Sequence, residues 1–261
     1  MPLEDGCRIA TAPRFSIEPA WAWSKRLRIN SGVREDDGRF FPNPDWRPAT
    51  DAELAVLVEG PHRLQHEFPR QDLCLFAITE HLRSRFWSLA QGALGGSAEG
   101  DDWFPRFARE LAEFARFKGL PLSPSCTFDL KVSQAGQPST QIDAAAGDAR
   151  LAGLDLDRPD SGPRPLGGIN LGDEPTGLVI LNLGPASIRE RLAATEPPEA
   201  SPATPRDLAR RFLGRFPSHP IVRVILRPGE GYWLPDDGLI FDGDTTDLAG
   251  IDFRLEIRGR E

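Results

Sequence analysis

The sequence predicts a mainly β protein, a jelly-roll barrel preceded by a helical N-terminal half that packs on its outer face. From Cys126 onward, short segments rich in β-branched or aromatic residues are bounded by Gly, Pro, Asn or Asp, as strands are. Before that point, apolar residues recur every three or four positions, as they do on amphipathic helices. Many short strands after a helical half fit helices packed against a jelly roll.

Length and composition indicate one soluble domain. The chain has 261 residues, of which 39% are hydrophobic and 27% are charged, values that are ordinary for a globular protein. The formal charge of −8 argues against a nucleic-acid partner, and no apolar run reaches the length of a membrane span. The three cysteines are far apart and are interpreted as free thiols. We therefore expect a cytoplasmic protein with no nucleic-acid partner and no membrane partner.

The N-terminal part divides into two segments. Residues 1–49 are expected to be irregular, with one strand at Arg26–Asn30, and residues 50–125 to form the supporting helices. The basic stretch Lys25-Arg26-Leu27-Arg28 follows two tryptophans, and it is interpreted as a solvated basic edge, with a membrane-surface element as the alternative.

Three helices are predicted before residue 120. Thr50-Asp-Ala-Glu53 has the pattern of a capping box and opens a helix that runs to Val58. Apolar residues have approximate helical spacing over 73–89 and again over 101–117, where Gly119 is the expected C-terminal cap.

The barrel is expected over residues 126–259. A short helix at Asp207–Phe216 interrupts its strands. The predicted strands are Thr127–Ser133, Leu166–Leu171, Gly177–Leu183, Ile221–Leu226, Gly231–Leu234, Gly238–Phe241 and Phe253–Ile257.

Two groups of polar residues near the strands have simple structural interpretations. Asp242, Asp244 and Asp247 are explained by a turn rich in Asp and Gly, with a divalent cation as the alternative. His219 precedes Pro220 and is interpreted as a strand entry.

Four segments between about Phe104 and Arg258 follow one another in a characteristic order and at characteristic spacings. They are Ser139–Asp143, Gly168–Gly172, Leu178–Leu183 and Pro228–Gly243. In these segments the chain resembles a bacterial family of iron(II)- and 2-oxoglutarate-dependent oxygenases, many of them in natural-product pathways. The resemblance implies that the barrel is a double-stranded β-helix.

The resemblance also implies that the metal site is degenerate. These enzymes hold Fe(II) with a His-x-Asp pair and a distal histidine. Here the pair corresponds to Gln141-Ile142-Asp143, and the distal ligand corresponds to Phe241. An amide is a weak ligand and a phenyl ring has no lone pair to donate, so no cofactor is expected. Fe(II) and 2-oxoglutarate would bind only in a rearranged site.

An arginine near the end of the last strand usually pairs with a carboxylate of 2-oxoglutarate in that family. Arg258 stands where the resemblance places this arginine, and Arg254 is a second candidate. Both alternate with Phe253, Leu255 and Ile257, so the polar face of an edge strand is an equally simple explanation.

Three functions remain open from the sequence. The first is a noncatalytic or repurposed barrel in a bacterial metabolic or natural-product pathway. It would bind a small polar metabolite, or pair with an active paralogue or a second copy of itself. The second is an enzyme with a rearranged metal site, or a metal-free one that uses Asp143 as a base, because burial beside an aromatic ring raises the pKa of a carboxyl. The third is a binding barrel unrelated to oxygenases. The expected pocket is lined by Gln141, Asp143, Tyr232, Trp233, Phe241 and Arg258.

Overall fold

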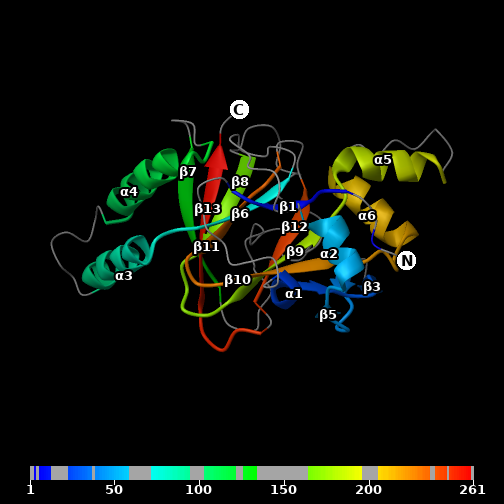
Figure 1. Ribbon diagram of the computed structural model, residues 1–261, viewed down its shortest axis with the longest axis horizontal. Coiled ribbons are helices and arrows are strands. Elements are labelled where there is room, and N and C mark those ends of the chain that lie inside the picture. Colours follow the sequence, from blue (N-terminus) through cyan, green and yellow to red (C-terminus); the bar gives the residue numbers. More distant parts are fainter. Residues whose placement is uncertain are drawn as a thin grey trace.

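Two β-sheets lie face to face at the centre of the computed structural model, and helices cover the outer face of each (Figure 1). The structure describes residues 3, 6–12, 23–36, 39–58, 72–94, 103–121, 126–133, 164–195, 205–235, 239–245 and 247–259.

The larger sheet, sheet A, has six strands drawn from both ends of the chain. Only β1 and β6 run parallel, and the other pairs are antiparallel. Its order is β1 (Ile9–Thr11), β6 (Leu73–Ala77), β11 (Glu230–Trp233), β8 (Arg164–Asn170), β13 (Asp252–Gly259) and β7 (Thr127–Ser133).

The second sheet, sheet B, has five antiparallel strands. Its order is β12 (Ile240–Asp244), β9 (Thr176–Leu181), β10 (Val222–Leu226), β2 (Leu27–Ile29) and β5 (Arg47–Pro48). A separate two-stranded ribbon is formed by β3 (Val33–Asp36) and β4 (Arg39–Pro42).

A central core fills the space between the sheets. It includes Leu73, Leu75 and Tyr232 from sheet A and Leu178, Ile180 and Val224 from sheet B. A strand between this core and a helical layer buries both of its faces, which explains why all six residues of β9 are buried.

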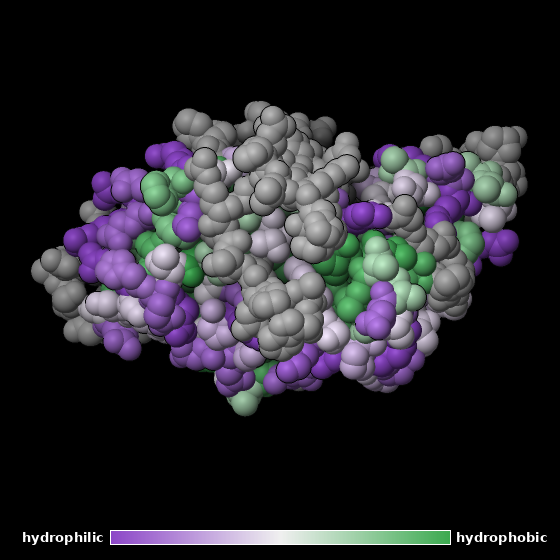
Figure 2. All heavy atoms as spheres, in the orientation of Figure 1, coloured by the Kyte–Doolittle hydropathy of each residue, from purple (hydrophilic) through white to green (hydrophobic). Residues whose placement is uncertain are grey.

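The helical layers each bury one apolar face. Helices α3 (Glu80–Leu94) and α4 (Trp103–Lys118) pack on sheet A through a core that includes Phe86, Phe107 and Leu111. Helices α5 (Pro185–Ala193) and α6 (Pro205–Arg215) pack on sheet B through Ile188, Leu208 and Phe212. Figure 2 shows hydrophilic residues over the outward side of the α3 and α4 layer, as expected for amphipathic helices. No helix among the described residues is long and apolar enough to span a membrane.

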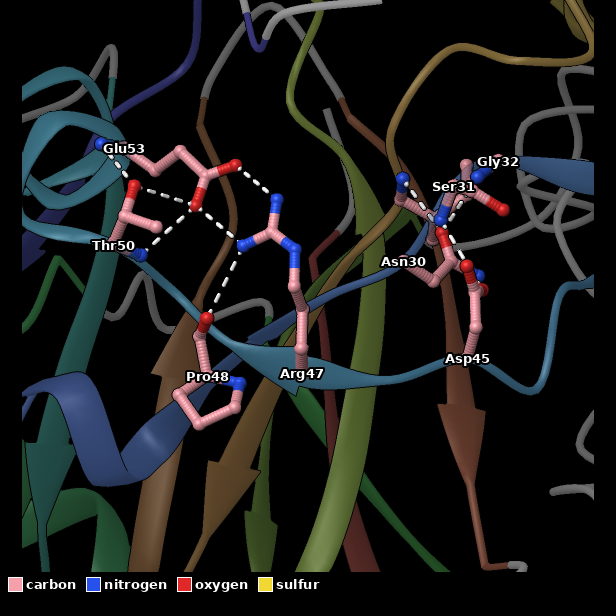
Figure 3. A network of polar contacts seen from close by, with 9 residues as sticks. Asn30, Ser31, Gly32, Asp45, Arg47, Pro48, Thr50 and Glu53 are labelled. Carbon is pink, nitrogen blue, oxygen red and sulfur yellow. Dashed lines mark hydrogen bonds and ion pairs between the residues drawn. The ribbon is translucent and has the colours of Figure 1, made fainter.

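The predicted helix boundaries are confirmed where capping chemistry is strong. Helix α2 (Asp51–Leu57) begins with a complete capping box, in which Glu53 N donates to Thr50 Oγ1 (3.3 Å) and Thr50 N donates to Glu53 Oε2 (2.9 Å; Figure 3). Arg47 adds two hydrogen bonds of 2.7 and 2.6 Å to the Glu53 carboxylate. Gly119 caps α4 with a φ of 81°.

The prediction of a helical N-terminal half is wrong, because helices are interspersed with strands throughout the residues that the structure describes. Residues 1–49 contain β1 to β5 and the short helix α1 (Trp23–Arg26), whereas only the strand near Arg26–Asn30 was expected. The helix predicted over 73–89 begins only at Glu80, because Leu73–Ala77 is strand β6, a mostly buried apolar run whose periodicity does not separate helix from strand. Helix α5 was not predicted.

At most of their ends, the predicted strands after residue 126 agree with the structure to within one or two residues. Strand β7 matches the predicted Thr127–Ser133 at both ends. A closed barrel is not formed by the part of the chain that the structure describes, which makes two open sheets instead. The layers of helices pack on outer faces as expected, but on both sheets rather than one.

Candidate functional site

A row of buried charged residues on β13 faces the space between the sheets. Leu255 pairs with Ile169, and both side chains belong to the core beneath α3 and α4. Since successive side chains of a strand point to opposite faces, the alternating polar residues point toward sheet B. Their exposed fractions are 1% for Asp252, 2% for Arg254, 4% for Glu256 and 1% for Arg258. The interpretation of the arginines as the polar face of an edge strand is therefore wrong, because β13 lies between β8 and β7 and this face is buried.

Arg258 has acidic partners within this row. Its Nε lies 3.0 Å from Glu256 Oε2 and 3.1 Å from Asp129 Oδ2 on the neighbouring strand β7, and its Nη2 contacts Glu256. The Asp129 side chain is 48% exposed, so this end of the row reaches the surface. Arg258 is held by two carboxylates of the protein itself.

Arg254 is less well satisfied. Its Nη2 lies 3.3 Å from Asp252 Oδ2, but this ion pair is not aligned as a hydrogen bond. Among the described residues, Nε and Nη2 of Arg254 and both carboxylate oxygens of Asp252 have no hydrogen-bond partner. Burial raises the pKa of Asp252, and the Arg254 charge opposes that rise. Buried charges with unused hydrogen-bonding capacity are costly, and they mark a candidate ligand site.

An aromatic pair spans the sheets beside this row. Tyr232 of β11 is 3% exposed, and its ring centroid lies 6.1 Å from that of Phe241 on β12, in an edge-to-face arrangement. Phe241 is half-buried against the central core.

Gly168 of β8 makes room for the tyrosine ring. A Cβ on Gly168 would lie 3.0 Å from the Tyr232 hydroxyl oxygen, so the ring crosses β8 from the β11 side. Gly168 pairs with Glu256 in register, and the hydroxyl therefore lies on the same face as the charged row.

The structure separates the predicted pocket residues into three groups. Tyr232, Phe241, Arg254 and Arg258 share the space between the sheets. Trp233 points the other way and packs beneath α3 and α4, so its place in the pocket is wrong. Gln141 and Asp143 lie outside the residues that the structure describes.

One buried ion pair on this interior face was missed. Both terminal nitrogens of Arg26 donate to the carboxylate of Glu230, at 2.8 and 2.7 Å, and Arg26 is only 3% exposed. The solvated basic edge predicted for Arg26 is therefore wrong. The Pro228-Gly229-Glu230 turn contained the signal, because an acid that follows a tight turn into a buried strand needs a partner.

Two segments of the oxygenase resemblance have structural roles. Asn170 closes the turn after β8, since its Nδ2 donates to the carbonyl oxygens of Glu174 (2.8 Å) and Leu226 (3.1 Å). Its Oδ1 accepts from Gly172 N at 2.9 Å. The turn residue Gly229 has a φ of 81°, in the region that favours glycine.

Asp242 and Asp244 lie in strand β12 rather than in the predicted turn, and Asp244 and Asp247 bind an arginine. Arg223 of β10 lies 2.9 Å from Asp244 Oδ2 and 2.6 Å from Asp247 Oδ2, and its guanidinium lies over Trp46. Among the described residues, no group of three or more His, Cys, Asp or Glu is placed to hold a metal ion.

The charged row, Tyr232, Phe241 and Gly168 thus form a candidate site for a small anion. Comparison with protein-family models, with curated proteins and with solved structures gives no match to this chain.

Proposed function

We propose that this protein binds a small organic carboxylate between its two sheets, with Arg254 as the anchor and Tyr232 beside it. The scaffold would be a double-stranded β-helix related to the 2-oxoglutarate oxygenases, repurposed for binding. The chain would act as a noncatalytic or accessory protein in a bacterial metabolic pathway.

The state of Arg254 carries the proposal. Its side chain is 2% exposed, yet Nε and Nη2 have no hydrogen-bond partner among the described residues. A carboxylate accepts two parallel hydrogen bonds from this fork, and such bidentate pairs are the strong ones. Asp252 balances the charge without using these donors, because its carboxyl is not aligned with them.

The nesting of strand pairs supports the scaffold. In a jelly roll, a long antiparallel ribbon is folded over two sheets. Strands near the two ends of the ribbon therefore pair with each other, and so do strands nearer its middle. Here β7 pairs with β13, β8 pairs with β11, and β9 pairs with β10. The first two pairs belong to sheet A and the third to sheet B, as a folded ribbon requires.

The residues do not fit the iron that the resemblance implies. Phe241, at the position of the distal ligand, is packed edge-to-face against Tyr232 and offers no lone pair. The metal-free alternative depends on Asp143, and nothing in the described residues favours it.

The test is ligand binding by the full chain. Thermal shift and calorimetry with 2-oxoglutarate, succinate and benzoate, against a chloride control, should show stabilisation by at least one carboxylate. A ligand at 100 times its Kd adds about 2.7 kcal/mol to the free energy of unfolding.

Variants locate the binding site. Arg254→Gln should abolish the shift, and Arg254→Lys should weaken it because the planar fork is lost. Arg116→Gln, on the exposed side of α4, should leave it unchanged. Circular dichroism verifies that each variant is folded. Carboxylate binding that survives in folded Arg254→Gln, or no binding by the unmodified chain, would refute the proposal.

A further inference from the structure

Strand β7 lies at an edge of sheet A in the part of the chain that the structure describes. It is the last strand of sheet A, next to β13, and within the described ranges no strand pairs with its other side. Val132 on β7 is 56% exposed, and Ile251, just before β13, is 55% exposed. They are two of the three large apolar side chains that are exposed among the described residues. A long edge strand with exposed apolar residues is suited to pair with another chain.

The sequence of β7 is complementary to itself when it is read antiparallel. With a twofold axis at Leu130, Asp129 lies opposite Lys131 of a second copy, and Phe128 lies opposite Val132. These are an opposite-charge pair and an aromatic–β-branched pair, and both kinds stabilise antiparallel strands. The twofold axis repeats each pair, so the ladder contains both twice.

The charge of Lys131 favours the same partner, whereas Asp129 already has an ion pair with Arg258 at 3.1 Å. In the register of β7 with β13, Lys131 lies opposite Arg254 and Asp129 lies opposite Glu256. Like charges directly opposite each other destabilise a strand pair. A second copy in the twofold register would place an opposite charge on the free side of both Asp129 and Lys131.

From these observations we infer that the protein forms a homodimer through β7, in which two copies of sheet A join into one continuous sheet. The partner is a second copy of this chain, aligned antiparallel about Leu130. This inference is independent of the proposed carboxylate site.

Charge reversal tests the pairing. Size-exclusion chromatography with light scattering, over a concentration series, should show a dimer for the unmodified chain. Lys131→Glu makes the 129 and 131 positions both acidic, and Asp129→Lys makes both basic. Each variant alone should dissociate with a Kd raised roughly tenfold or more, because two attractive pairs become repulsive. Arg116→Glu is the matched reversal on α4 and should not change the Kd.

Mixing the two variants distinguishes pairing from misfolding. The mixture should form a heterodimer, since Glu at 131 then faces Lys at 129. Lys131→Glu places an acid opposite Arg254, whereas Asp129→Lys removes an ion-pair partner of Arg258. Circular dichroism of each variant alone therefore verifies that it is folded. A chain that is monomeric throughout the series, a dimer that both reversals leave unchanged, or a mixture that stays monomeric would overturn the inference.

A cysteine scan tests the register. In a background with Cys7 and Cys126 changed to serine, Leu130→Cys should form an intermolecular disulfide on mild oxidation, because opposite residues of an antiparallel pair are within bonding reach. Val132→Cys, which lies four residue positions along the ladder from its own copy, should link much less. Equal linking of both variants would contradict the twofold register.

Discussion

The imidazole of His219 is buried in surroundings that favour its neutral form. The residue is fully buried, its ring packs edge-to-face on Phe212, and its Nε2 lies 3.4 Å from Asn182 Oδ1. Burial, with the charge of Arg191 as a second cause, lowers the pKa of His219 from 6.5 to about 4.

This shift predicts a pH dependence of stability. The unfolded chain takes up a proton below pH 6.5, whereas the folded chain does so only near pH 4. The free energy of unfolding should therefore fall as the pH drops through that window, by about 3 kcal/mol in all. Urea unfolding at pH 7 and pH 5 measures this, and His219→Gln should flatten the dependence. His81→Gln, on the exposed side of α3, is the control, and an unchanged slope in His219→Gln would contradict the assignment.

Gly168 is a second residue whose identity the structure requires, because a larger side chain would meet the Tyr232 ring. Its missing side chain lets the Tyr232 ring cross β8, with contact distances from an added Cβ of 3.0 to 3.1 Å. Gly168→Ala should push the ring aside, cost about 1–3 kcal/mol through overpacking, and alter the near-ultraviolet circular dichroism. In Gly214→Ala the added Cβ meets only Phe40, at 3.7 Å, so that variant should be neutral or stabilising. Equal stability of the two variants would show that the ring has room to move.

At the scale of elements, Arg26 and Glu230 connect the segment leading into β2 of sheet B with strand β11 of sheet A. Removing one partner leaves the other charge buried, so Glu230→Gln should cost about 3–5 kcal/mol. Replacing both residues by methionine should cost much less, because no charge is left unpaired. Urea unfolding of the three proteins gives the comparison. A double variant as unstable as Glu230→Gln would mean that Glu230 acts mainly through its hydrogen bond from Arg227 N.

The elements also explain what the sequence could and could not predict. Alternation on β13 correctly separated Phe253, Leu255 and Ile257 from the charged residues, but it did not indicate which face met water. Both faces of this strand are buried, one beneath α3 and α4 and one toward sheet B, so a polar face was mistaken for a solvated one. In β6 the same double burial removed the alternation altogether, and a strand was mistaken for a helix. Tyr232 and Arg254 were named from the family resemblance, whereas Asp252 and Gly168 could be identified only from the strand register.

At the scale of the whole molecule, each sheet shares a core with its neighbour on either side. Sheet A contributes to both the core beneath α3 and α4 and the central core, and sheet B contributes to the central core and the core beneath α5 and α6. We therefore expect one cooperative unfolding transition, with urea curves from tryptophan fluorescence and far-ultraviolet circular dichroism that coincide.

Distant core truncations test that cooperativity. Phe107→Ala and Phe212→Ala remove fully buried rings from opposite helical layers. Each should lower the single global midpoint and cost about 3–5 kcal/mol. Phe117→Ala is the control, because the Phe117 side chain is mostly exposed and its removal loses little buried apolar area. Two separate transitions in either variant would indicate that the layers unfold independently.

The position of β13 between β7 and β8 has a consequence for biosynthesis. Those two flanking strands are complete by residue 170, but they do not pair with each other, and the strand that joins them ends at residue 259. At ordinary rates of translation, a ribosome needs roughly 5 to 20 seconds to add the intervening 90 or so residues. Throughout that interval, β7 and β8 of the nascent chain each have an edge that is not yet paired with β13. Chaperone capture of the growing polypeptide should therefore be strongest between these two points, and it should end when β13 emerges from the exit tunnel.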